Sequence, residues 1–173
     1  MNLIKLFEMQ KVLDERIIRE KGLGGQNLLP EKFLALRTEL GEFANELPQT
    51  FKFWSNKKND YEKALVEYVD CLHFILSIGL ELQVSVEYLE AATREFGCVA
   101  RTGVQTINNV FTHVNDVELN VLFNRHSAAL DEYTDLFLRF LLLGTHFGFE
   151  WEQIEESYYA KNATNHVRQQ EGY

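Results

Sequence analysis

Apolar residues recur along the chain at spacings of three and four, the pattern of helices that bury one face. Residues that interrupt helices are scarce, with two prolines and ten glycines among 173 residues. We therefore expect a single all-α domain over residues 1–173, built as a bundle of about six helices. The expected helices cover residues 2–21, the segment between Asn27 and Pro48, the segment 65–79, residues 84–99, residues 116–143 and residues 150–173, with loops at 51–60 and 103–115.

The third of these helices is predicted to be buried on nearly all sides. Its apolar positions are Leu65, Val66, Val69, Cys71, Leu72, Phe74, Ile75, Leu76 and Ile78. Glu67 and Asp70 lie among them on one face, because residues three apart are neighbours on a helix. A carboxylate in a dry interior takes up a proton or finds a cation, so these two acids need a partner.

The preceding helix offers a matching group of acids. Glu39 and Glu42 share a face, and Glu46 follows one turn later. If the two helices pack antiparallel, this face meets Glu67 and Asp70. Hard oxygen ligands suit Mg²⁺, which also binds phosphate oxygens. The spacing therefore predicts a magnesium site between the two helices.

Two other segments carry side chains suited to a nucleotide. The loop 51–60 combines large aromatic residues with lysines, so it either packs into the core or forms a wall for a flat ring with cations near phosphates. In the last helix, Lys161, Asn165 and Arg168 fall on one face. Such aligned donors suit a polyphosphate, although a solvated face would also explain them.

Composition narrows the classes of function. A net charge of -9 argues against a general binder of nucleic acid or anionic membranes. No apolar run reaches the ~20 residues of a membrane helix, and acids come too early for a signal peptide. Cys71 and Cys98 have apolar surroundings and no metal-binding spacing, which indicates reduced thiols in a cytoplasmic protein.

The second half of the chain repeats part of the first. Glu132 and Asp135 follow Glu67 and Asp70 at an interval of 65 residues, and Gly79 and Gly144 share that interval. This indicates a worn internal duplication. Because no Glu-x-x-Glu lies at the same interval, near residues 104–111, we expect one metal site per chain. Glu132 and Asp135 would then be surface or interface charges.

Four motifs in order carry a family resemblance: Glu39-x-x-Glu42, Phe51-Lys-Phe-Trp54, Glu67-Tyr-Val-Asp70-Cys-Leu-His73-Phe74, and Lys161-Asn162-x-x-Asn165-x-x-Arg168-Gln-x-x-Gly-Tyr173. Together they resemble the dimeric, all-α dUTP pyrophosphatases (dUTPases). That family belongs to the all-α nucleoside triphosphate pyrophosphatase superfamily, with the MazG-like enzymes. The acid motifs are general to the superfamily, whereas the last motif points to the dUTPase branch. The resemblance runs from Gln10 to Tyr173 and implies one all-α pyrophosphatase domain.

The resemblance also implies roles for single residues. It implies metal ligands at Glu39, Glu42, Glu67 and Asp70, with Mg²⁺ as the cofactor, and phosphate contacts at Lys161, Asn162, Asn165 and Arg168. It implies nucleoside contacts at Gln10 for uracil, at Trp54, and at His73 and Phe74 for the deoxyribose. Lys52, in the same loop as Trp54, is a further candidate for substrate binding. Glu42 or Glu46 would be the base that activates water.

Water attack between the α and β phosphates would convert dUTP to dUMP and pyrophosphate. This reaction keeps uracil out of DNA and feeds thymidylate synthesis. The resemblance suggests that dUDP is cleaved as well. A dCTP pyrophosphatase or a broader MazG-like enzyme would keep the same acids, so base choice stays open at this point.

Two other classes of protein are consistent with parts of the pattern. A di-iron carboxylate bundle needs two carboxylate-x-x-His elements on two helices. Asp70 and His73 form one, but none of His113, His126, His146 and His166 has an acid three residues earlier. A helical interaction bundle without chemistry would leave the acids of the buried helix unexplained.

A homodimer is expected from the apolar run 136–143, which is apolar on more than one side of its helix. An exposed surface of this kind favours a two-fold interface, and the family resemblance implies one too. The alternative is that neighbouring helices of the same chain cover the run completely.

Overall fold

The computed structural model describes residues 2–95 and 101–172, and within these ranges it contains eight helices and no strand. The helices are α1 (Leu3–Lys21), α2 (Leu29–Glu46), α3 (Pro48–Phe51), α4 (Tyr61–Leu82), α5 (Val86–Glu95), α6 (Gly103–Leu122), α7 (His126–His146) and α8 (Trp151–Gln170). The all-α prediction is confirmed. None of the described helices is long and apolar enough to cross a membrane.

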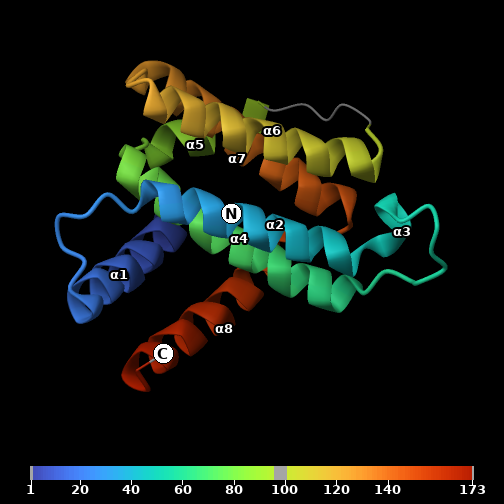
Figure 1. Ribbon diagram of the computed structural model, residues 1–173, viewed down its shortest axis with the longest axis horizontal. Helices are drawn as coiled ribbons and strands as arrows, with labels where there is room; N and C mark the ends of the chain where they lie inside the picture. The colour runs from blue at the N-terminus through green and yellow to red at the C-terminus, as the bar shows by residue number, and fades with distance from the viewer. Residues whose placement is uncertain (1, 96–100, 173) are drawn as a thin grey trace.

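Helix α4 lies in the middle of the molecule and packs against α1, α2, α7 and α8 (Figure 1). It begins at Asp60, whose carboxylate accepts a hydrogen bond from the Lys63 N–H at 3.1 Å. It ends at Gln83, which adopts the left-handed conformation with φ 57°. Most of its residues are buried, as predicted, but Val66 is 44% exposed.

Two antiparallel helix pairs form most of the remaining bundle. Helix α2 runs alongside α4, and α6 runs alongside α7 on the other side of the molecule (Figure 1). Helix α1 and helix α8 both contact α4 and each other. One face of α4 is therefore directed toward α1, α2 and α8.

The predicted boundaries in the second half were wrong. The segment 103–115 is helical, because Thr102 and Gln105 form a capping box that begins α6. The expected helix over 116–143 is broken between α6 and α7, where Asn124 has φ 53° and the Arg125 N–H donates to the Asn120 carbonyl at 2.8 Å. With the short α3, these changes raise the helix count above the six expected.

Smaller differences occur elsewhere. Asn27 accepts a hydrogen bond from the Leu29 N–H at 3.2 Å, but Leu28 is the N-cap of α2. Helix α5 begins at Val86 rather than residue 84, and the end of the expected range, with Cys98, lies outside the described residues. Cys71 is a free, buried thiol whose pKa is raised by burial, so it is unreactive.

Two buried tyrosines connect the helix pairs reciprocally. The Tyr68 hydroxyl donates to the Phe140 carbonyl, and the Tyr133 hydroxyl donates to the Ile75 carbonyl, both at 2.9 Å. Each ring lies against a glycine of the opposite helix, because a Cβ at Gly79 would clash with Tyr133 and one at Gly144 would lie 2.7 Å from Tyr68 Oη. The two donors are 65 residues apart, and so are the two acceptors and the two glycines.

The first helices of the two pairs, α2 and α6, also correspond residue by residue, but at a different interval in the sequence. Helix α2 begins at Leu29 and α6 at Gly103, which are 74 residues apart. The buried residues correspond at this interval: Phe33, Leu36, Leu40 and Phe43 in α2, and Ile107, Val110, Val114 and Val117 in α6. The chain between the helices is therefore shorter in the second pair, where it consists of residues 123–125.

Most of the apolar run 136–143 is covered within the chain. Five of its residues are buried in the bundle: Leu136, Phe137, Leu138, Phe140 and Leu143. Leu141 and Leu142 are partly buried, so the neighbouring helices shield most of the run but not all of it, and the dimer stays a prediction. Large exposed apolar side chains instead occur at the turn from α6 to α7, at Leu119, Leu122 and Phe123.

The close approach of α4 and α7 gives a first prediction. Gly79→Ala should lower the free energy of unfolding by about 1–3 kcal/mol, because the added methyl group displaces the Tyr133 ring and its hydrogen bond. Gly41→Ala is the control, since a Cβ at this helical glycine meets nothing within 4 Å beyond its chain neighbours and the backbone of its own helix. It should be neutral or stabilising. Urea unfolding of both variants measures the difference, and equal stabilities would contradict the packing described.

Candidate active site

Carboxylates from α2 and α4 converge where the two helices face each other. Oxygen atoms of Glu39, Glu67 and Asp70 all lie within 4.8 Å of one another. Glu42, one turn after Glu39, is exposed and lies outside this group of three. Its charge still raises the pKa of Glu39 and of Glu67, and Glu46 also raises the pKa of Glu67. The acids singled out in the sequence therefore form one negative region.

The pKa values show that this region lacks positive charge. Burial, followed by the charges of Asp70, Glu42 and Glu67, raises the pKa of Glu39 to about 7. Burial and then Asp70 raise the pKa of Glu67 in the same way. Lys161 is the cation that lowers both values, and it does not offset the other causes. Such a site favours the binding of a further cation.

Helix α8 brings its donors to the same place. The Lys161 ammonium donates to Asp70 Oδ2 at 2.5 Å. Asn165 and Arg168, on the next two turns, line the same cavity as Glu39 and Asp70. Asn162 differs, because it is buried and does not line the cavity. The alignment of three donors predicted from the sequence therefore faces the acids.

A cavity of about 420 Å³ extends from the acids between α1, α2, α4 and α8. This volume is typical of sites that hold small molecules. Its lining includes apolar side chains, at Leu13, Ile17, Ile18, Leu28 and Phe74, as well as the acids and donors. The cavity thus offers contacts for a flat ring and for an anionic group.

A buried polar network lies beside the cavity and joins three helices. Gln10 on α1 is only 4% exposed. Its Oε1 accepts from the Tyr158 hydroxyl at 2.9 Å and lies 2.7 Å from His73 Nδ1. Because Oε1 is an acceptor, His73 Nδ1 must carry the proton, and Nε2 is then a buried acceptor without a partner. Burial, and then Lys161, lower the pKa of His73 to about 3, so the ring is neutral.

Three polar residues that line the cavity were not predicted from the sequence: Asp14, Lys32 and Ser77. Asp14 accepts from Gln10 Nε2 at 2.7 Å and from the Ser77 hydroxyl at 2.5 Å. Lys32 Nζ lies 3.6 Å from Asp14 and 2.6 Å from Glu81. The sequence did contain a signal for two of these residues. Asp14 lies one turn after Gln10, and Ser77 one turn after His73, so each is a polar residue on an otherwise apolar helix face.

The aromatic loop is not part of this cavity. Trp54 is 67% exposed and packs edge-on against Phe53, and Lys52 donates to Asn45 at 2.7 Å. The loop follows α3, at the end of the α2–α4 pair away from α1 (Figure 1). The structure therefore does not bring Trp54 and Lys52 to the other predicted site residues, and a role for them stays a prediction.

Comparison with known proteins gives a family match over nearly the whole chain. A family model described as dUTPase matches residues 2–173. No curated protein matches the chain. The family match therefore covers α1, α2, α4 and α8, which together line the cavity.

The buried histidine predicts a pH dependence of stability. The pKa of His73 is lowered in the folded protein, so its contribution is complete above the unfolded pKa near 6.5 and is lost as the pH falls toward 3. The loss should be about 1.4 kcal/mol per pH unit. Urea unfolding at several pH values should show a steeper decrease for the wild type than for His73→Gln. Identical slopes would show that His73 titrates normally in the fold.

Proposed function

The chain belongs to the dUTPase family and is a dUTP diphosphatase that hydrolyses dUTP, and from that premise we propose that it works with Mg²⁺ at the α2–α4 acids. The proposed ligands are Glu39, Glu42, Glu67 and Asp70. The observation that carries this proposal is the convergence of acids and aligned donors on one cavity. The whole chain would act as one all-α nucleoside triphosphate pyrophosphatase domain.

The acids fit a hard divalent cation. All of the proposed ligand atoms are carboxylate oxygens, which Mg²⁺ prefers. Glu39 and Glu67 have raised pKa values because their charges are crowded and partly buried, and a cation would remove this cost. Bound Mg²⁺ would supply positive charge for the phosphates and lower the pKa of a water molecule near the α phosphorus.

The phosphate donors come from α8. Lys161, Asn165 and Arg168 would hold the phosphate oxygens and orient the triphosphate for in-line attack. Lys161 would exchange Asp70 for a phosphate oxygen, because the carboxylate is then engaged with the cation. Arg168 would stabilise negative charge as it develops on the leaving pyrophosphate. Glu42 or Glu46 would take the proton from the attacking water.

The other end of the cavity would hold the nucleoside. Phe74 and the apolar wall from α1 would contact the flat ring and the sugar. The unprotonated Nε2 of His73 would accept a hydrogen bond from the sugar hydroxyl. Gln10, whose Nε2 donates a hydrogen bond to Asp14, would face the polar edge of uracil. Because the contacts for cleavage involve only the first two phosphates, dUDP would also be a substrate.

We also propose that the two helix pairs arose by duplication and that the active protein is a homodimer. The 65- and 74-residue registers and the reciprocal tyrosines support the first proposal. The exposed apolar residues Leu119, Leu122 and Phe123 support the second. A cytoplasmic location stays a prediction from the cysteine content.

Glu39→Gln provides a test of the metal site. Turnover should fall by about 100-fold or more, since the variant loses one metal ligand. In EDTA near pH 8 the same variant should be more stable than the wild type, because it removes one of several crowded charges. Pyrophosphate release and thermal melting measure the two effects. Glu62→Gln, an exposed acid on α4, is the control and should change neither.

A substrate panel tests base choice and metal dependence together. Pyrophosphate release in Mg²⁺ should be fastest with dUTP among dUTP, dCTP, dTTP, dATP, dGTP and UTP, and should stop in EDTA. Release of phosphate from dUDP should also depend on Mg²⁺. Comparable rates with dCTP would favour the broader pyrophosphatase, and activity in EDTA would refute the metal site.

Sedimentation tests the dimer separately. A species near twice the chain mass of 20.2 kDa at micromolar concentration is expected. Leu122→Lys with Phe123→Lys should shift it toward the monomer if the α6–α7 turn lies in the interface, because buried lysines need partners. A wild-type species at the chain mass would refute the dimer.

A further inference from the structure

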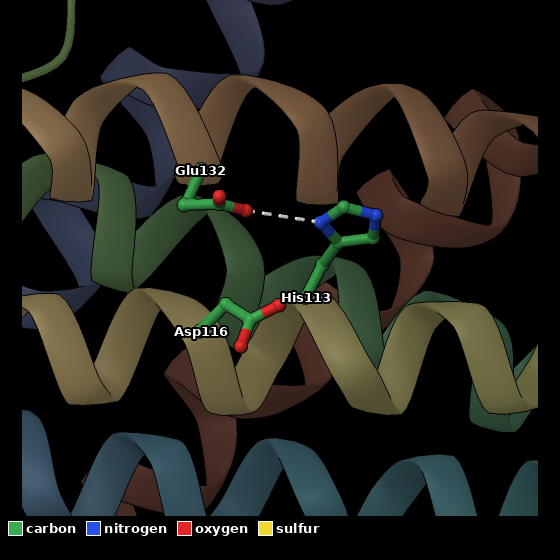
Figure 2. Close-up of side chains that lie close together, drawn as sticks. All are labelled: His113, Asp116 and Glu132. Carbon is green, nitrogen blue, oxygen red and sulfur yellow. Dashed lines mark hydrogen bonds and ion pairs between the residues drawn. The ribbon is translucent and has the colours of Figure 1, made fainter.

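A second group of potential metal ligands lies between α6 and α7, away from the active site. His113 Nδ1 lies 3.2 Å from Glu132 Oε2. Asp116 follows His113 by one turn on α6, and one ligand atom from each residue lies within 4.8 Å of the other two. Figure 2 shows the His113 ring and the Glu132 carboxylate directed at each other across the gap between the helices, with Asp116 beside them. We call these three residues the α6–α7 cluster.

The α6–α7 cluster is sheltered but reachable. The side chains of His113 and Glu132 are 15% and 33% exposed. Two carboxylates face one imidazole here, so the group carries net negative charge whichever protonation state the imidazole has. Arg37 of α2 binds Asn115 at 2.8 Å and Glu118 at 2.5 Å, the residues on either side of Asp116 and Val117 in the sequence. The partial exposure of His113 and Glu132 allows an ion to reach the cluster from solution.

The register of the two helix pairs places this cluster at the position of the active-site acids. At the 74-residue interval between α2 and α6, His113 corresponds to Glu39 and Asp116 to Glu42. At the 65-residue interval between α4 and α7, Glu132 corresponds to Glu67. The same two intervals relate the buried residues of α2 and α6 and the paired tyrosines of α4 and α7. The counterparts of Glu39 and Glu42 therefore lie at residues 113 and 116, outside the segment 104–111 expected from the 65-residue interval.

We propose that His113, Asp116 and Glu132 bind one divalent transition-metal ion, with Zn²⁺ as the probe. The imidazole in place of a carboxylate moves the preference from Mg²⁺ to metals that accept nitrogen ligands. Three protein ligands leave a fourth position for water. Helix α8, which supplies the phosphate donors, packs on α1 and α4 and not on α7. The ion therefore stabilises the α6–α7 pair and takes no part in dUTP hydrolysis.

Equilibrium dialysis with Zn²⁺ in excess Mg²⁺ tests this proposal, because Mg²⁺ competes for the all-oxygen site. One Zn²⁺ per chain should stay bound to the wild type and to Glu39→Gln, so the result does not depend on the proposed active site. His113→Ala should weaken Zn²⁺ binding by about 100-fold or more. His126→Ala, an exposed histidine on α7 outside the cluster, should bind as the wild type does.

Two further measurements separate ligation from folding. His113→Gln keeps a hydrogen-bond donor facing Glu132, so it should fold normally yet lose the visible absorption of bound Co²⁺. Zn²⁺ should raise the melting temperature of the wild type and not that of His113→Gln. Undiminished Zn²⁺ binding in His113→Gln, loss of the bound Zn²⁺ in Glu39→Gln, or no binding by the wild type in excess Mg²⁺ would each overturn the proposal.

Discussion

The repulsion among carboxylates at the centre of the bundle constrains the rest of the structure. Helix α4 is covered by α1, α2, α7 and α8, so Glu67 and Asp70 are partly buried. Burial and neighbouring acids raise the pKa of Glu39 and Glu67, which means that the fold is less stable with these groups charged. The ion pair from Lys161 to Asp70 offsets part of this cost and holds α8 against α4. The contact that relieves the repulsion therefore also positions the phosphate donors.

A neutral network complements these charges on the nucleoside side. Gln10, His73 and Tyr158 come from α1, α4 and α8, and the His73 ring stacks on Tyr158 at 4.2 Å between centroids. Because each polar atom of Gln10 is engaged, its amide has one orientation, and the protonated nitrogen of His73 is determined by it. Three of the four helices around the cavity are thus fixed relative to one another by a network that includes two lining residues, Gln10 and His73.

The sequence was most informative where charged residues occur within an otherwise apolar helical pattern. Acids three apart in an otherwise apolar helix predicted the α2–α4 site, and aligned donors in α8 were placed correctly relative to one another. Local signals of helix ends were overlooked: the capping box at Thr102 begins α6 where a loop was expected, and the left-handed Asn124 separates α6 from α7 where the apolar pattern suggested one helix. The position of Trp54 could not be predicted, since the path of a loop depends on tertiary contacts rather than on its own composition.

The unequal intervals between the helix pairs explain why no counterpart of Glu39 and Glu42 is found near residues 104–111. A shorter connection between α6 and α7 shifts their relative numbering without changing which faces meet, because helix packing depends on the side chains at the contact and not on the loop. Reciprocal hydrogen bonds from Tyr68 and Tyr133 fix the two pairs in equivalent positions. Side chains that face the gap in one pair therefore face it in the other, and the chemistry of each gap follows from the residues there: carboxylates from Glu39 and Glu67 in one, an imidazole from His113 in the other.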